Sequence, residues 1–391
     1  MAEWRRASLR EFVELQRGQS YKSAYLDEPG PWLLGLGTIA RNGGFRGENL
    51  RRYGGPTPDR MLVRPGDIYV SLKDVTHAAD LLGSVARFPD GLGPGRLTQD
   101  TIRLDVDDEL IDRGYLYWLL RSPDYRAHCR NLGTGTTNLD LSREDFLRYS
   151  FMLPDRREQE AIATTLSAFD DKIVANARLS ATADALAREL FVAAAGESEA
   201  TVLLADLASN SREVVQPAEA IGAYVGLEHV PRRRMWLEEI GDSGTVTSAK
   251  SQFRRGDVLF GKLRPYFHKV VSAPTDGVSS TDILVVRAHE PRLAGFVLAA
   301  VTSDALVERA VAASEGTRMP RASWKDLASW PVPWPGRDTA LELSGRVAVL
   351  RDAVEARLRE NVTLAATRDT LLPQLMSGKL RVREAAEMAG L

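Results

Sequence analysis

The sequence has a single cysteine, Cys129, among its 391 residues. One thiol excludes a disulfide within the chain and a zinc site built from several thiolates. The five histidines are scattered, and no two of them have the His-x-x-x-His spacing of a metal-binding helix. We therefore expect neither a metal ion nor a cofactor.

Long apolar runs are also absent. Nowhere do 18 apolar residues follow one another, and residues 1–6 lack the apolar core of a secretion signal. We expect a soluble protein of the cytoplasm with no membrane partner. The formal net charge of −2 argues against indiscriminate binding to nucleic acid.

Motifs of catalysis are missing as well. No glycine-rich loop ends in Gly-Lys-Ser or Gly-Lys-Thr, which excludes an ATP-driven motor of that class. Residues 264–267 match only part of the motif with which amino-methyltransferases hold a base, and its Asn or Asp acceptor is lacking. His128 stands beside Cys129, but neighbours on a helix point about 100° apart, so a core or surface role is favoured over a catalytic pair. We expect no catalytic residue in this chain.

The sequence instead contains an internal repeat. Residues 64–70 (RPGDIYV) are echoed by residues 255–260 (RGDVLF). Three more residues recur at a constant shift of 181: Gly135, Ser142 and Asp145 return as Gly316, Ser323 and Asp326. Two units of about 150 residues fit the length of the chain, and its 44% hydrophobic content is enough for two cores.

Each half closes with a long pattern of apolar residues at a spacing near 3.5, over residues 159–195 and 340–376. The first stripe consists of Ile162, Leu166, Phe169 and Ile173, continued by Leu179, Ala183, Leu186 and Leu190; the second consists of Leu343, Val347, Leu350 and Val354, then Leu364, Leu371 and Leu375. This spacing predicts two helices zipped along a seam. Asn176 and Asn361 fall on or near the stripes, where they either fix the register of the pair or lie on its solvated flank.

Short β-branched or aliphatic runs predict strands within each half. We expect strands at 33–39, 66–71, 82–88, 101–106, 224–226, 257–261 and 283–287, and helices at 111–120, 124–129, 293–301 and 304–313. Residues 41–58 and 89–95 are expected to be loops. The predicted fold is therefore α+β, with two similar strand-rich α/β units joined by two long antiparallel coiled-coil helices in a pseudo-two-fold duplication.

Positive charge gathers at comparable places in the two halves. Residues 41–64 carry six arginines against two acidic residues, a local net charge of +4. Residues 229–269 carry nine Lys or Arg against four acidic residues, a local net charge of +5. Such patches on a nearly neutral chain favour nucleic-acid binding by defined contacts, although charge alone leaves solvated loops as an alternative.

Three groups of residues resemble a known family. Leu371–Leu380 resembles the closing segment of type I restriction–modification specificity subunits; residues 153–173 resemble the start of that family's central conserved helix; residues 256–266 and 280–282 are similar to its target-recognition domains. The resemblance covers nearly the whole chain in the order expected for the family. It implies target-recognition domains at 1–153 and 197–336, conserved helices at 154–196 and 337–378, and a tail at 379–391.

The resemblance also implies a function. A specificity subunit binds double-stranded DNA and reads a split target, one half-site for each recognition domain, with unread base pairs between them. It recruits two adenine-N6 methyltransferase subunits and, in the full complex, motor-nuclease subunits, and it is not itself an enzyme. The main alternative is a duplicated scaffold that joins partners through its helices without reading DNA. A single-chain enzyme acting on DNA is disfavoured by the missing motifs.

Base reading needs long polar or cationic side chains on loops or helix ends held by a rigid scaffold. The residues that meet this description are Arg41, Asn42, Arg46, Arg51, Arg52, Lys73, Thr134, Thr136, Thr137 and Asn138 in the first half, and Arg232, Arg233, Arg234, Lys262, Arg264, Tyr266, Lys269, Thr317, Arg318 and Arg321 in the second. The zipped helix pair would act as a ruler that sets the separation of the two half-sites.

Overall fold

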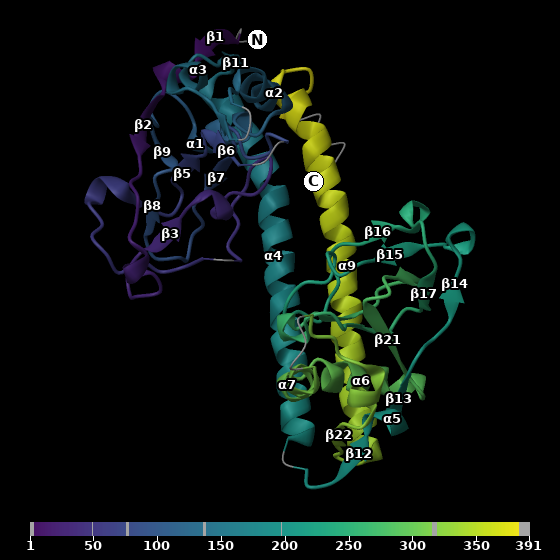
Figure 1. Ribbon diagram of the computed structural model, residues 1–391. Helices are drawn as coiled ribbons and strands as arrows, with labels where there is room; N and C mark the ends of the chain where they lie inside the picture. The colour runs from purple at the N-terminus through teal and green to yellow at the C-terminus, as the bar shows by residue number, and fades with distance from the viewer. Residues whose placement is uncertain are drawn as a thin grey trace. The chain divides into compact units, whose positions relative to one another are not determined.

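The computed structural model describes residues 4–48, 50–75, 78–135, 138–196, 198–314 and 319–382. The chain divides into unit 1, residues 1–171 with 364–391, and unit 2, residues 172–363 (Figure 1). The long helices α4 (Arg156–Ala195) and α9 (Arg337–Met376) each contribute one part to each unit.

Unit 1 is built on an antiparallel sheet with the strand order β2-β9-β5-β7. These strands are β2 (Val13–Arg17), β9 (Ile102–Val106), β5 (Ile68–Val70) and β7 (Val85–Arg87). A second sheet holds β3 (Trp32–Leu34), β8 (Gly95–Leu97) and β4 (Leu62–Val63), and two strand pairs join β1 (Arg5–Ser8) to β11 (Ser150–Leu153) and β6 (Lys73–Asp74) to β10 (Leu139–Asp140). The helices are α1 (Arg113–Leu119), α2 (Pro123–Leu132) and α3 (Arg143–Leu147).

Unit 2 repeats this plan. Its main sheet has the order β13-β21-β18-β19, with β13 (Ala208–Asn210), β21 (Ile283–Ala288), β18 (Val258–Gly261) and β19 (Val270–Ser272). The second sheet holds β14 (Val214–Val215), β17 (Lys250–Phe253), β20 (Gly277–Ser279), β15 (Ala223–Val225) and β16 (Gly241–Asp242), and β12 (Thr201–Leu203) pairs with β22 (Pro331–Pro333). The helices are α5 (Leu204–Leu207), α6 (Ala294–Val301), α7 (Asp304–Ala313) and α8 (Trp324–Ala328). The predicted duplication is confirmed.

Alternation of side chains explains why the repeated Gly-Asp segment begins a central strand. In β5, Ile68 and Val70 belong to the main core of unit 1, whereas Tyr69 points into the smaller core beneath the second sheet. In β18, Phe260 and Leu259 divide in the same way between the two cores of unit 2. A strand that is buried on both faces reads as a continuous apolar run, as these two do.

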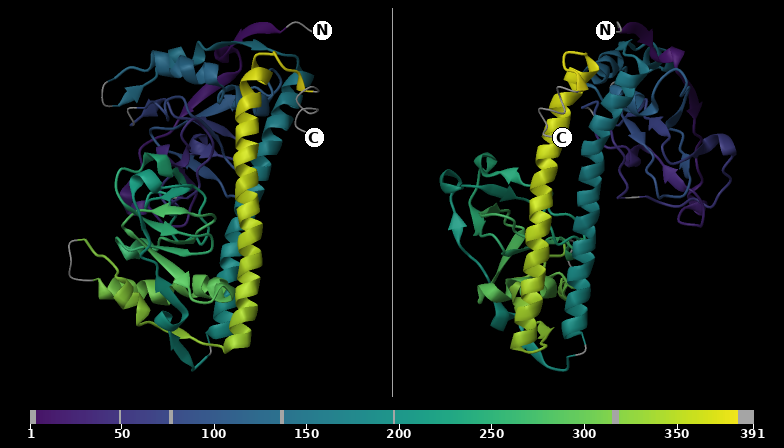
Figure 2. Two further views of the ribbon diagram at one scale, coloured as in Figure 1. Left: turned by 90° about the vertical axis from the view of Figure 1, so that its right-hand side faces the viewer. Right: turned by 180° about the vertical axis from the view of Figure 1, so that it is seen from behind.

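The long helices are antiparallel partners within each unit (Figure 2). In unit 1, Leu166 near the start of α4 shares a core with Leu375 near the end of α9. In unit 2, Phe191 near the end of α4 shares a core with Leu343 near the start of α9. Each helix has 40 residues, which corresponds to about 60 Å at 1.5 Å per residue. The predicted fold class, including the coiled-coil helices, is confirmed.

One part of the predicted seam is wrong. Leu179 and Leu186 of α4 are 40% and 45% exposed, so they do not continue the stripe. Alternating steps of three and four residues from Phe169 lead instead to Asn176, Ser180 and Ala183, all of which are buried. The seam of α4 thus changes from large apolar residues to polar and small ones, and the leucines nearby lie on its flank.

Candidate nucleic-acid interface

Three loops meet in unit 1 at the end of the main sheet. The middle loop, whose described parts are 71–75 and 78–84, joins β5 to β7. Its two neighbours are the first loop, 39–45, and the third loop, whose described parts are 133–135 and 138–141. The Asn42 N–H donates to the Asp80 carbonyl at 2.9 Å, which ties the first loop to the middle one. The Leu141 N–H donates to the Leu72 carbonyl at 2.8 Å, beside the β6–β10 pair, which ties the third loop to it.

Two buried charges fix the shape of the middle loop. Asp74 is fully buried and accepts the N–H of Leu81 at 2.6 Å. Arg126 of α2 is 3% exposed and donates to the carbonyls of Ala79 at 3.1 Å and Asp80 at 2.9 Å. Burial lowers the pKa of Arg126. Because backbone groups of residues 79–81 meet both charges, this part of the loop is shaped before any ligand arrives.

Unit 2 contains the same arrangement, with a first loop at 230–236, a middle loop at 261–269 and a third loop whose described part is 319–322. The Arg233 N–H donates to the His268 carbonyl at 2.9 Å, and the Ala322 N–H donates to the Lys262 carbonyl at 2.9 Å. We call these surfaces the three-loop surfaces of unit 1 and unit 2.

Backbone strain recurs in the two first loops. Asn42 has φ 61° and Arg233 has φ 54°, so both adopt the left-handed conformation that residues other than glycine rarely enter. In each case the same residue donates its N–H to the middle loop, and an arginine precedes it, Arg41 or Arg232. Strained residues of this kind persist where the surrounding structure holds them in place, and they cluster at binding sites.

In unit 1 the surface brings together about half of the residues predicted to contact DNA. Arg41, Asn42, Lys73, Thr134 and Asn138 lie on its three loops. Arg46 follows the first loop and pairs with Glu48 at 3.1 Å. Thr136 and Thr137 lie outside the described residues.

Arg51 and Arg52 are engaged beside β3 rather than with the three loops. Arg51 makes a two-pronged pair with Asp27, at 3.0 and 2.6 Å. The Arg52 guanidinium stacks 3.7 Å from the centre of the Trp32 ring. These contacts hold the polypeptide against the second sheet, and a contact of either arginine with DNA stays a prediction.

In unit 2 most of the predicted residues lie on the loops. Arg232, Arg233 and Arg234 are on the first loop, Lys262, Arg264, Tyr266 and Lys269 are on the middle loop, and Arg321 is on the third; Thr317 and Arg318 lie outside the described residues. Tyr266 is 50% exposed, whereas the Lys269 ammonium is half-buried against the Leu227 carbonyl, and burial lowers its pKa. Only some of these side chains are therefore placed to reach a ligand.

The arginines of the first loop in unit 2 have distinct partners. Arg232 lies over the Phe267 ring, 4.0 Å from its centre, and Arg233 pairs with Asp304 at 3.0 Å. Burial raises the pKa of the Asp184 carboxyl, and the positive charge of the half-buried Arg234 opposes this rise. The loop is thus joined to α7 and to α4 through charged side chains.

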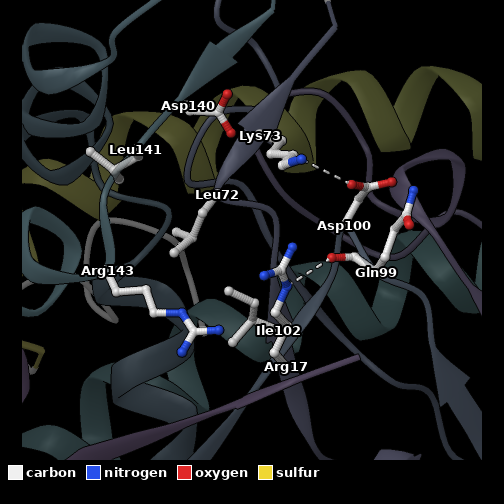
Figure 3. Close-up of a pocket in the computed structure, with 9 residues that line it drawn as sticks. All are labelled: Arg17, Leu72, Lys73, Gln99, Asp100, Ile102, Asp140, Leu141 and Arg143. Carbon is white, nitrogen blue, oxygen red and sulfur yellow. Dashed lines mark hydrogen bonds and ion pairs between the residues drawn. The ribbon is translucent and has the colours of Figure 1, made fainter. Parts of the chain in front are cut away.

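A pocket of about 210 Å³ opens on the unit 1 surface (Figure 3). Its lining residues are Arg17, Leu72, Lys73, Gln99, Asp100, Ile102, Asp140, Leu141 and Arg143. Lys73 Nζ lies 3.4 Å from Asp100 Oδ1, and Arg17 Nε donates to the Gln99 carbonyl at 3.3 Å. Hydrogen-bond donors and acceptors therefore stand side by side, which is what the edge of a base pair requires.

Among the polar residues of this pocket, the sequence predicts only Lys73 as a DNA contact. Arg17 ends β2, and Asp100 lies in the turn before β9, so sheet pairing brings together residues that are far apart in the sequence. The repeat supplies the signal, because Asp282, in the segment 280–282 that is similar to target-recognition domains, occupies the corresponding turn of unit 2.

The described residues offer little for catalysis. Burial raises the pKa of the Cys129 thiol to about 11, so it is not an activated nucleophile. His128 instead places Nε2 2.8 Å from the Asp145 carbonyl oxygen. No group of three or more His, Cys, Asp or Glu side chains in the described ranges is arranged to hold a metal ion. Within those same ranges no helix is both long enough and apolar enough to cross a membrane.

Comparison with known proteins agrees with this geometry. Residues 60–182 match the type I restriction modification DNA specificity domain. The matched segment contains the start of α4 together with much of unit 1. The predicted resemblance to type I restriction–modification specificity subunits is confirmed.

Two relatives extend the comparison. The chain is 30% identical over 148 residues to the Escherichia coli type I restriction enzyme EcoDI specificity subunit, over 36% of this chain and 32% of that protein. The match thus spans about a third of that relative's length. The crystal structure of a type I restriction–modification system S subunit from M. genitalium covers 95% of this chain and 96% of its own, with 17% identity and a TM-score of 0.56. This second likeness shows that the fold is shared along nearly the whole chain.

Proposed function

We propose that the chain is a DNA-binding specificity subunit of a type I restriction–modification complex, in which each unit reads one half of a split target. The observation that carries this proposal is that the three-loop surface occurs twice, once in each unit, with a left-handed residue at the equivalent place in each first loop and equivalent backbone hydrogen bonds between the loops. A scaffold that only joins partners has no need of two such surfaces.

The subunit would have no catalytic activity of its own. It would present a bound duplex to adenine-N6 methyltransferase subunits, two of them in the complete complex, and to motor-nuclease subunits where these are present. Such a complex would act in the cytoplasm on the cell's own DNA and on incoming DNA. The identity of the domain at residues 60–182 supports this role, as does the absence of catalytic motifs from the sequence.

Co-expression with the cognate methyltransferase, followed by single-molecule sequencing for N6-methyladenine, tests the proposal. We expect methylation confined to one bipartite motif with a fixed unread spacer. The methyltransferase expressed alone is the control and should leave that motif unmodified. Methylation at an uninterrupted motif, or the same pattern with and without this chain, would contradict the proposal and favour a scaffold.

A further inference from the structure

Each unit has an ion pair at an equivalent position. Its cation lies on the middle loop in unit 1 and on the third loop in unit 2. In unit 1, Lys73 Nζ lies 3.4 Å from Asp100 Oδ1. In unit 2, Arg321 Nη2 lies 3.4 Å from Asp282 Oδ1. Both carboxylate side chains are 27% exposed, and the cations are 43% and 53% exposed.

Strand register shows that the two carboxylates are equivalent. Ile102 lies opposite Val70 in the sheet of unit 1, as Leu284 lies opposite Phe260 in that of unit 2. Asp100 lies two residues before Ile102, and Asp282 lies two residues before Leu284. The same turn therefore holds an aspartate in both units.

The same comparison shows that the two cations are not equivalent. Lys73 is paired with Asp140 across the short β6–β10 ladder. The bridge at this place in unit 2 joins Leu263 to Arg321. Lys73 thus corresponds to Leu263, and Arg321 corresponds to Asp140. Both units therefore have a cation beside the aspartate, but the two units exchange its position: it lies on the middle loop in unit 1 and on the third loop in unit 2.

Fold stability does not require such an exchange. Ion pairs as exposed as these contribute little, about 0–1 kcal/mol. What the two arrangements share is a donor beside an acceptor, both reachable from outside the protein. An ammonium has three donor hydrogens and a carboxylate has about four acceptor positions, so one mutual contact leaves each of them able to bind a ligand.

We infer that these pairs, Lys73 with Asp100 and Arg321 with Asp282, each read the major-groove edge of one G·C base pair. Guanine offers the acceptors O6 and N7 to Lys or Arg, and the N4 amino group of cytosine donates to Asp or Glu. A cation and a carboxylate held side by side match both bases at once. The inference rests on the proposed function and adds that each half-site contains a G·C pair at the position reached by this ion pair.

The unit 1 pocket supports this inference because Arg17 and Arg143 line it together with Lys73 and Asp100. Those arginines can hold the phosphate backbone while the Lys73–Asp100 pair faces the base edge, a division of labour usual in DNA recognition. Unlike a base contact, a phosphate contact affects all sequences alike.

The test uses the whole chain in complex with its methyltransferase. Lys73→Gln and Asp100→Asn should relax the motif at a G·C position of one half-site, and Arg321→Gln and Asp282→Asn should relax it at a G·C position of the other. The preference for that base pair should fall roughly 5- to 100-fold, and the conservative variant Lys73→Arg should keep much of it. Arg10→Gln and Arg309→Gln are matched controls, since each removes one exposed positive charge whose partner, Glu144 or Ser329, lies outside the three loops.

Modified duplexes make the test specific to the base edge. Replacing the identified guanine with 7-deazaguanine removes N7 and should weaken binding of the wild-type complex but add little to the loss in Lys73→Gln. Inosine keeps O6 and N7 and should bind normally. Circular dichroism melting confirms that each variant is folded.

The outcomes separate this inference from the proposed function. If the wild-type complex methylates no bipartite motif, both the base-reading inference and the proposed function are wrong. A bipartite motif whose half-sites lack G·C, or variants that weaken binding to all sequences equally, would overturn the base-reading assignment and leave the specificity subunit intact.

Discussion

His268 shows how one buried side chain makes the stability of unit 2 depend on pH. It is 2% exposed, and its Nε2 lies 3.0 Å from the Thr302 carbonyl oxygen, so this nitrogen donates. Burial lowers its pKa below 6.5, assisted by Arg188 and Arg233 and opposed by Asp304. The folded protein therefore keeps this imidazole neutral at a pH where the unfolded chain takes up a proton.

The sign of the effect follows from that difference. The stability that His268 contributes is fully present above pH 6.5 and is lost as the pH falls below it, because only the unfolded state gains the proton at first. We expect the drop in melting temperature between pH 7.5 and pH 5.5 to be smaller in His268→Gln than in the wild type. His289→Gln changes an exposed histidine and should show the wild-type drop. Equal drops in all three proteins would refute this account.

The sequence could predict which residues lie on the three-loop surfaces where charge and loop position coincide. Lys73 and Arg321 were both selected as long cationic side chains on loops, and both line the three-loop surfaces. Asp100 and Asp282 could not be predicted in this way, because the cation beside each carboxylate is distant in the sequence. Their proximity to these cations depends on strand register, which no local pattern reveals.

At the scale of elements, the centre of the helix pair is polar. Asn176 is 3% exposed, and its Nδ2 donates to Asn361 Oδ1 at 2.8 Å and to Glu360 Oε2 at 3.0 Å. The hydrogen bond from Asn176 to Glu360 is the main cause of the lowered pKa of the Glu360 carboxyl. Asn361 is half-buried. Of the two roles left open for the asparagines, the structure favours the one within the seam, where a polar pair fixes the register of two helices.

Alanine substitutions distinguish the observed seam from the one expected from sequence. Asn176→Ala removes two hydrogen bonds at a buried position and should lower the free energy of unfolding by about 1–3 kcal/mol. Leu179→Ala, three residues away at a 40% exposed position, should change it by about 0.5 kcal/mol or less. Denaturant unfolding of both variants measures the difference. A larger loss in the leucine variant would restore the seam predicted from the sequence.

Element prediction worked best where apolar runs are long. The expected helix at 304–313 matches α7, and the strand expected at 257–261 matches β18 to within one residue. The second sheets of both units were largely missed, since strands such as β8 and β20 contain glycine and have only three residues each. Short strands of this kind are defined by their neighbours rather than by their own sequence.

At the scale of the whole molecule, both long helices pass without interruption from one unit into the other, after Asp171 in α4 and before Leu364 in α9. The constant shift of 181 residues now has a structural meaning, because α4 begins at Arg156 and α9 begins at Arg337. The sequence could predict this plan because duplication and heptad spacing are global patterns. We propose that the shared helix length sets the number of unread base pairs in the target.

Lengthening both helices together tests this proposal. Inserting seven residues after Asp171 and seven before Leu364 preserves the 3.5-residue spacing of the seam and adds about 10.5 Å to each helix. At about 3.4 Å per base pair, the unread spacer should grow by roughly three base pairs while both half-sites stay the same. A four-residue insertion in each helix, about 6 Å, should lengthen it by one or two base pairs. Methylation-site sequencing reads the spacer directly, and an unchanged spacer in both insertion variants would show that helix length does not set it.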